Sequence, residues 1–392
     1  MLFIYIIKTD FIMSSFNISI DTPSSFGDYS SNKNVENPIF YPCGLTNLGN
    51  TCFLNSCVQL LNYTDEFAFE IEKINNDTSL PQTHDQVVFY EWRELREMMN
   101  KIKGQMTNPV ATPGKFVKMI HDIARLKGRD LFTGWAQNDL PEFLLFMIEC
   151  MHNSRRRAVS INIYGSSESS TDDLAFQCYS MLKDNYERGE YSEFSDICYG
   201  VYVSRLFTTD GSILHSNKAE TYSLLDLPIP NSGISQLLKP DAMNVNLHIP
   251  HIKLTDCFDA FMADEILTGW FNEKTNNIES VKKNITFWSF PNILIIILKR
   301  YSPDGMYKNE SFIDFPLDDL DLSKYVVGYN ANSYKYKLFG VANHMGGISG
   351  GHYTAFVNTD NKWYCFNDSN VNEIPVNVVV SPFAYCLFYR KK

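Results

Sequence analysis

Apolar residues recur with a helical spacing in the first half of the chain. From Cys52 to Leu61 they occupy positions 53, 54, 57, 58, 60 and 61, a broad stripe that predicts a helix. A second helix is predicted after Asp139, because Glu142 follows three residues later as in a capping box and a nearly all-apolar run comes next. Such an apolar helix must be buried. The stretch from Cys43 to about residue 150 is therefore predicted to be helical.

Beyond about residue 195 the pattern changes to that of strands. Residues 199–216 alternate on both sides of a Thr-Asp-Gly turn, as in a hairpin. Residues 292–301 ("NILIIILKRY") form a continuous β-branched run, which is typical of a central strand covered on both faces. Four more strands are predicted, separated by Gly, Asn and Asp turns, at residues 334–345, 351–359, 362–368 and 383–391. Since helices come first and strands follow, the sequence predicts an α+β fold with one long antiparallel sheet.

Two regions are not predicted to form regular elements of the domain. The opening "MLFIYIIKTDFIM" has no basic start, and Lys8 breaks its apolar run too early for a signal core or a membrane span. The Ser-, Asn- and Asp-rich residues that follow favour disorder. We expect residues 1–41 to be a flexible tail and residues 42–391 to form one domain, which contains a polar connector at about residues 155–173.

Charge and cysteine usage narrow the class of protein. The formal net charge of −11 argues against nucleic acid or an anionic membrane as the main partner. The nine cysteines are odd in number, scattered and free of any C-x-x-C pair, which favours free thiols over disulfides and disfavours a cysteine-based zinc site. We therefore expect a cytoplasmic and/or nuclear protein.

One cysteine and one histidine stand in positions suited to chemistry. Cys52 follows a run of turn-forming residues and opens a predicted helix, while His352 follows two glycines and opens a predicted strand. The next strand ends in Asn367 and Asp368, so these side chains could reach the imidazole ring. A dispersed Cys, His and Asn/Asp set is typical of thiol proteases. On these residues alone, a packing cysteine and a structural histidine remain an open alternative.

Longer stretches carry a resemblance to a known family. "GLTNLGNTCFLNSCVQLL" (44–61) resembles the cysteine box of the ubiquitin-specific proteases, which are papain-like thiol hydrolases. "GGHYTAFV" followed by "WYCFNDSNV" resembles their histidine box, and residues 137–143 resemble their Gln-Gln-Asp-Ala-x-Glu-Phe helix. Other motifs follow in the family's order, namely "LLDLPIP", "FPNILIIILKRY", "IDFPLDDLDLSKY" and "AYCLFYRK". The resemblance extends from Cys43 to about Arg390. It implies a thumb of N-terminal helices, and a palm and fingers of C-terminal antiparallel strands.

The resemblance also implies catalytic roles. Cys52 takes the place of the nucleophile, His352 that of the base, and Asp368 or Asn367 that of the group that orients the base. Of the last two, we expect Asp368 to matter more. Asn47 takes the place of the oxyanion donor, and the helix start at Cys52 should favour the thiolate over the thiol.

Further residues are implied as contacts of the substrate's C-terminal tail. They are Gln137, Asp139, Glu142, His344, Gly351 and Tyr353. His344 is also a second candidate for the base. Asp139 and Glu142 could be mistaken for an acid/base pair, but helix capping and tail contacts are the preferred interpretation.

The activity implied by the resemblance is deubiquitination. The enzyme would cleave the peptide or isopeptide bond after the C-terminal glycine of ubiquitin through an acyl-thioester on Cys52. Its partners would be ubiquitin or ubiquitin-conjugated proteins, with no nucleic acid and no membrane, and the chain would be a monomer. Two alternatives stay open: a hydrolase of another ubiquitin-like modifier, and an inactive ubiquitin-binding module of the same fold.

The sequence departs from the family in the fingers. Many members hold a zinc ion there with two C-x-x-C pairs, but the corresponding stretches here, about 207–212 and 269–277, contain no cysteine. His215, His248 and His251 have no ligand-like pairing with cysteine. We therefore expect no metal and no cofactor, and fingers that persist as β-ribbons.

Overall fold

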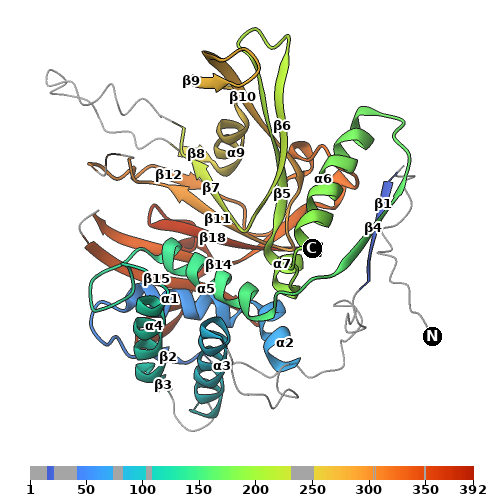
Figure 1. The fold of residues 1–392 in the computed structure, drawn as a ribbon. Helices are drawn as coiled ribbons and strands as arrows, with labels where there is room; N and C mark the ends of the chain where they lie inside the picture. Colours follow the sequence, from blue (N-terminus) through green and yellow to red (C-terminus); the bar gives the residue numbers. More distant parts are fainter. Residues whose placement is uncertain are drawn as a thin grey trace, which may run out of the picture.

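A large mixed sheet forms the centre of the molecule (Figure 1). The computed structural model describes residues 16–21, 42–73, 83–102, 108–230, 251–302, 304, 306–347 and 350–392. The sheet has eight strands in the order β17-β16-β15-β14-β18-β11-β7, and β13 pairs with β14. Their bounds are β7 Leu224–Pro228, β11 Ile293–Lys299, β13 Leu320–Asp321, β14 Lys335–Gly347, β15 Gly350–Thr359, β16 Lys362–Asn367, β17 Asn370–Ile374 and β18 Ala384–Lys391.

The predicted α+β class is confirmed, and the predicted strands of this sheet are present. The expectation of a wholly antiparallel sheet is wrong, because β11 pairs in parallel with β7. A parallel pair needs a long crossover connection, and here the chain between the two strands contains a helix and a hairpin.

The strand β11 is covered on both faces, as its sequence predicted. Its odd-numbered isoleucines belong to the core shared with the N-terminal helices: Ile293, Ile295 and Ile297. Its even-numbered residues belong to the core on the opposite face: Leu294, Ile296 and Leu298. A strand between two cores needs apolar residues at every position, which explains the unbroken run.

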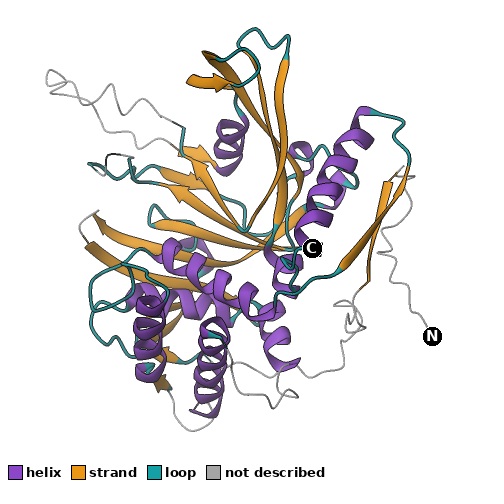
Figure 2. Cartoon of the chain, viewed as in Figure 1, coloured by secondary structure: helices purple, strands orange, loops and turns teal. Residues whose placement is uncertain are grey.

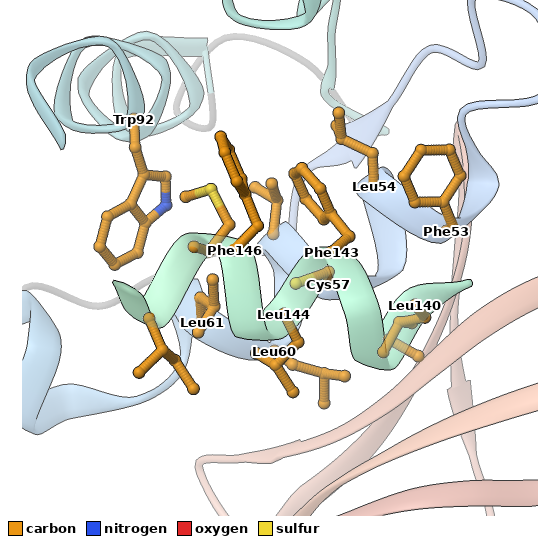
Figure 3. Close-up of a cluster of buried hydrophobic side chains, with 14 of the residues drawn as sticks. Phe53, Leu54, Cys57, Leu60, Leu61, Trp92, Leu140, Phe143, Leu144 and Phe146 are labelled. Atoms are coloured by element: carbon orange, nitrogen blue, oxygen red, sulfur yellow. The ribbon is translucent and has the colours of Figure 1, made fainter. Parts of the chain in front are cut away.

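Helices from the first half of the chain lie together against one side of the sheet (Figures 1 and 2). They are α1 Cys52–Asn62, α2 Asp65–Lys73, α3 His84–Ile102, α4 Gly114–Leu126 and α5 Leu140–Arg155. Helix α1 packs against β15, β14 and β16 and against α5. Figure 3 shows Cys57 between α1 and α5, and its side chain is completely buried. Every residue of α1 is buried, so this helix fixes the thumb to the palm.

Asp139 stands at the N-terminal cap position of α5 but does not cap the helix with its side chain. Its carboxylate oxygens accept hydrogen bonds from the hydroxyls of Tyr353 (2.7 Å) and Tyr385 (3.2 Å). The capping-box prediction is therefore wrong for this side chain, because tertiary partners on the sheet replace the local one. Pro141, which suits the first turn of a helix, stands just inside the helix start.

A four-stranded antiparallel sheet rises from the palm as the fingers (Figure 1). Its order is β6-β5-β10-β9, with bounds β5 Gly200–Thr208, β6 Leu214–Tyr222, β9 Glu265–Asn272 and β10 Asn277–Ser289. The hairpin predicted for residues 199–216 is confirmed as β5 and β6, with Gly211 in the left-handed region at the turn. Helix α9 (Leu254–Met262) packs at the base of the fingers.

The predicted tail and connector contain structure. Strand β1 (Phe16–Asp21) pairs in antiparallel register with β4 (Ser160–Gly165), and Ile18 lies opposite Ile163. The connector prediction for residues 155–173 is corrected accordingly, since β4 lies inside it and α6 (Ser170–Glu187) begins there. The physical reason is the alternation in "SINIYG", which buries Ile161 completely in a small core. The rest of the predicted tail, up to residue 41, lies outside the described residues.

The remaining elements are short. They are β2 Gly44–Leu45, β3 Val110–Ala111, α7 Glu193–Cys198, β8 His251–Lys253, β12 Phe312–Asp314 and three 3₁₀ turns at Ser323–Tyr325, Ala331–Ser333 and Val376–Val378. Among the helices that the structure describes, none is long and apolar enough to cross a membrane.

Candidate active site

A turn that is held by hydrogen bonds leads into α1, and Cys52 is the first residue of this helix. Gly49 and Asn50 adopt left-handed backbone conformations (φ 106° and 55°), which glycine and asparagine tolerate best. The side-chain oxygen of Asn47 accepts hydrogen bonds from the N–H groups of Gly49 (2.9 Å) and Thr51 (3.2 Å). The turn residues before Cys52 in the sequence therefore fix the backbone that leads into the cysteine.

The Cys52 side chain is only 4% exposed, and this burial raises the pKa of its thiol. A hydrogen bond from the backbone N–H of Tyr353 favours the thiolate and opposes that shift, whereas the carboxylate of Asp368 adds to it. The backbone N–H groups of Cys52 and Phe53 at the helix start lower the pKa of the thiol, as expected, but burial has the larger effect. A raised pKa disfavours the thiolate, so attack by Cys52 needs a base. Tyr353 directly follows His352 on β15, the strand against which α1 packs.

The His352 imidazole is oriented by Asn367. Its Nε2 lies 2.7 Å from the side-chain oxygen of Asn367. An amide oxygen can only accept, so Nε2 carries the hydrogen and Nδ1 is the basic nitrogen. The last residue of β16 thereby sets the tautomer of the first polar residue of β15.

Asp368 does not orient His352. It occupies the tight turn between β16 and β17 with φ 50°, and its two carboxylate oxygens accept from the side-chain amides of Asn47 (2.9 Å) and Asn55 (2.8 Å). Its carbonyl also accepts from the N–H of Leu45 (2.9 Å). The expectation that Asp368 matters more than Asn367 for the base is therefore corrected. The turn thus directs the carboxylate toward Asn47 and Asn55, which lie on either side of Cys52 in the sequence.

Asn55 was missed by the sequence analysis. Its side chain is only 2% exposed, although it stands in the apolar stripe of α1. A buried amide must find partners, and Asn55 finds Asp368. The polar residue inside an apolar stripe was the available signal.

Gln137, which precedes α5, links the turn before Cys52 to the start of β15. Its side-chain oxygen accepts from the N–H of Gly351 (3.0 Å), and its amide nitrogen donates to the Gly351 carbonyl (3.3 Å) and to Asn50 (3.4 Å). A side chain at Gly350 would overlap the Gln137 amide. The glycine pair before His352 therefore permits a close approach, as the sequence predicted.

Two pockets share Asp139 and Tyr301 as lining residues, and the first of them reaches Cys52. The first, of about 250 Å³, is lined by Cys52 and by five of the six predicted tail contacts: Gln137, Asp139, His344, Gly351 and Tyr353. The second, of about 410 Å³, is lined by the sixth, Glu142, together with Asp139 and Asp226. Burial raises the pKa of all three of these carboxyl groups. The predicted tail contacts thus meet in one continuous region.

His344 is not suited to be the base. Its Nδ1 already contacts the Tyr301 hydroxyl (2.7 Å) and the Lys308 ammonium (3.2 Å). Burial, with the positive charges of Lys308 and His352, lowers its pKa to about 4. The base position is left to His352.

Among the residues that the structure describes, no group of three or more His, Cys, Asp or Glu side chains could hold a metal ion. His215 packs on the Trp270 ring and His251 on the Phe312 ring, whereas His248 lies outside the described residues. At the β9–β10 turn, Asn272 donates to both oxygens of Glu279 (3.2 Å each). The β9–β10 turn, where the family's second C-x-x-C pair would lie, is thus held by side-chain hydrogen bonds.

We expect the purified protein to contain no stoichiometric zinc. Its thermal stability and activity should be unchanged by a chelator, since a structural zinc site needs four close ligands. Elemental analysis and a melting curve with and without chelator test this. One zinc ion per chain would contradict it.

Comparisons with known proteins agree on one family. The model of the family described as ubiquitin carboxyl-terminal hydrolase matches residues 43–389. Ubiquitin carboxyl-terminal hydrolase Usp2 of Drosophila melanogaster is 31% identical over 363 residues, which cover 89% of this chain and 35% of the relative. Ubiquitin carboxyl-terminal hydrolase 2 of Homo sapiens is 30% identical over 355 residues, which cover 88% of this chain and 54% of the relative. This chain thus spans about a third to a half of these relatives.

A solved structure supports the fold. A chain of the SAGA DUB module of Ubp8, Sgf11, Sus1 and Sgf73 bound to monoubiquitin superposes with a TM-score of 0.64 at 21% identity. The match covers 91% of this chain and 70% of that chain. At this identity the likeness concerns the fold.

Proposed function

This chain belongs to the ubiquitin carboxyl-terminal hydrolase family, and from that premise we propose that it is a thiol-dependent deubiquitinase. It hydrolyses the peptide or isopeptide bond after the C-terminal glycine of ubiquitin. The observation that carries the proposal is the hydrogen bond of His352 Nε2 with Asn367, since His352 lies on β15 and this strand packs against α1, the helix that begins at Cys52.

His352 acts as the proton carrier. Its Nδ1 removes the thiol proton as the Cys52 sulfur attacks the scissile carbonyl, and the imidazolium then protonates the leaving amine. The acyl-thioester on Cys52 is hydrolysed by a water that His352 deprotonates. The raised pKa of the cysteine is compatible with this order, since proton transfer accompanies attack.

The oxyanion is stabilised at the start of α1. The backbone N–H of Cys52 is one donor. The Asn47 amide nitrogen carries two hydrogens and gives one to Asp368, so the other is left for the oxyanion. Asp368 and Asn55 then serve to hold Asn47 in place.

The walls of the first pocket suit a substrate tail of glycines. Gln137 and His344 both lie against the Gly350–Gly351 backbone, where a side chain would overlap them. These contacts fill the space beside the Gly350–Gly351 backbone and leave little room there for the side chains of a substrate. The neighbouring structure bound to monoubiquitin supports ubiquitin as the modifier.

We further propose a monomer that works in the cytoplasm and/or nucleus, without nucleic acid or membrane. All nine cysteines are free in the structure, and eight of them are buried. Free thiols are typical of reducing compartments. The negative net charge supports protein partners.

A ubiquitin probe with a C-terminal propargyl group tests the function. It should label the wild-type protein at Cys52, and probes made from other ubiquitin-like modifiers should label it much more slowly. Labelling by another modifier's probe alone would overturn ubiquitin as the substrate. No labelling by any probe would overturn the enzyme assignment.

Replacement of Asn367 and replacement of Asp368 should have different effects. Asn367→Ala removes the group that orients the imidazole, so kcat should fall on the order of 10²-fold with little change in KM. Asp368→Ala releases Asn47 and Asn55 and should also lower thermal stability, because two amides lose a charged partner. Steady-state kinetics and melting curves measure both. A normal kcat for Asn367→Ala would contradict the assigned role.

A further inference from the structure

Lys308 makes an unusual set of contacts beside the cleft. It lies between β11 and β12, and its ammonium contacts three acceptors at the end of β14. They are the His344 carbonyl (2.9 Å), the Gly346 carbonyl (3.0 Å) and His344 Nδ1 (3.2 Å). The mechanism proposed above gives this half-buried lysine no role.

The segment that carries Lys308 is folded back on itself. Tyr301 and Lys308 form an antiparallel bridge, and the N–H of Ser302 donates to the Tyr307 carbonyl (3.1 Å). Tyr301 and Lys308 thus reach His344 from the two sides of one loop. Their side chains tie this loop to the β14–β15 hairpin, which also carries His352.

These contacts fix the state of the His344 ring. An ammonium has three hydrogens and no lone pair, so each of its three partners must accept. Nδ1 is therefore unprotonated, which makes the Tyr301 hydroxyl a second donor to it and leaves the hydrogen on Nε2. The lowered pKa of His344 keeps the ring neutral.

The opposite edge of the ring forms a wall of the cleft. His344 Nε2 lies against Gly351, where a side chain would overlap it. The ring also contacts the Tyr353 ring in a tilted arrangement with centroids 4.5 Å apart. His344, Gly351 and Cys52 line the same pocket. A change in the tautomer or tilt of the His344 ring would therefore alter the part of the pocket that is proposed to hold the substrate tail.

We propose that Lys308 is a positioning residue for the reaction, which holds His344 as its Nε2–H tautomer and braces the end of β14 against the loop between β11 and β12. This inference rests on the proposed function, because the tail that passes His344 is that of the modifier. Lys308 acts through His344 and does not touch the reacting atoms. Its loss should weaken tail binding more than the chemical step, since His352 is held separately by Asn367.

The kinetic test uses Lys308→Met, which keeps the length of the side chain and removes its donors. We expect KM for a ubiquitin C-terminal amide to rise about tenfold, as for a lost hydrogen bond to a charged group, while kcat changes less than about threefold. Lys308→Arg retains donors and should restore part of the loss. The matched control is Lys337→Met on β14, the strand whose end Lys308 contacts. The exposed Lys337 side chain pairs only with Asp318 among the described residues, so this change should leave both constants unchanged. An unchanged KM for Lys308→Met would overturn the proposal.

A second test needs no substrate, so its failure can be told apart from failure of the proposed function. Nitrogen-15 spectra of histidine-labelled protein, with His344→Gln used to assign the ring, should show unprotonated Nδ1 and protonated Nε2 in the wild type. Lys308→Met should give a mixture of tautomers at an unchanged melting temperature. A wild-type ring protonated on Nδ1, or a Lys308→Met ring identical to the wild type, would overturn the assignment even in an active enzyme.

Discussion

Replacement of Cys52 by alanine is expected to lower hydrolysis of a ubiquitin C-terminal amide by a factor on the order of 10⁴ or more. The reason is that the acyl-thioester forms on this sulfur, and a methyl group cannot replace it. The fold should be unaffected, because a small side chain at the start of α1 fits the same space. Binding of ubiquitin should also be retained, since most of the pocket lining comes from other residues. Single-turnover kinetics and calorimetry with ubiquitin measure the two effects separately.

The matched control is Cys365→Ala. Cys365 is a half-buried free thiol on β16, so its removal tests whether loss of any accessible cysteine lowers the rate. It should retain activity. Residual activity of Cys52→Ala within tenfold of the wild type would contradict the assignment of the nucleophile.

Elements with a strong local pattern could be predicted from the sequence. The apolar stripe of α1 reflects the burial of every residue of that helix, and the unbroken run of β11 reflects the burial of all its residues except the last, Lys299. The β5–β6 hairpin was equally accessible, because its turn residues mark the reversal directly. In these cases the residues that determine the structure are neighbours in the chain.

The choice between Asn367 and Asp368 could not be made in this way. Both residues are polar, adjacent and near His352 in the sequence. The positive φ of Asp368 turns its carboxylate toward α1, and its partners there are hundreds of residues away in the chain. Only the packing of the β16–β17 turn against β2 determines which side chain reaches the ring. Gly44 allows that packing, since a Cβ there would lie 2.5 Å from the Ser369 carbonyl oxygen.

The same distinction explains two other features of the site. Asp139 has the sequence context of a helix cap, yet tyrosines from β15 and β18 compete for its carboxylate. Cys52 has the context of a thiolate at a helix start, yet tertiary burial has the larger effect on its pKa. Local rules describe what a residue can do, and distant partners decide between the possibilities.

Replacement of His352 by alanine is expected to lower kcat by about 10²–10⁴-fold, as for a lost general base. The pH dependence should change as well. Without the imidazole, the reaction depends on the fraction of Cys52 that ionises by itself, and burial raises the pKa of that thiol above its usual value near 9. A raised thiol pKa means that the thiolate is scarce at neutral pH and increases about tenfold with each pH unit until the pKa is reached.

The residual rate of His352→Ala should therefore rise steeply between pH 7 and pH 9, whereas the wild-type rate should depend less on pH in this range, because His352 removes the thiol proton. A rate profile over this range, with Cys52→Ala as the baseline, measures the difference. His84→Ala is the matched control, because His84 is exposed at the start of α3, away from the cleft lining, and its loss should leave both rate and profile unchanged. A His352→Ala variant with the wild-type pH profile would show that another group accepts the thiol proton. His344 would then be tested next, although its basic nitrogen is already occupied by Tyr301 and Lys308.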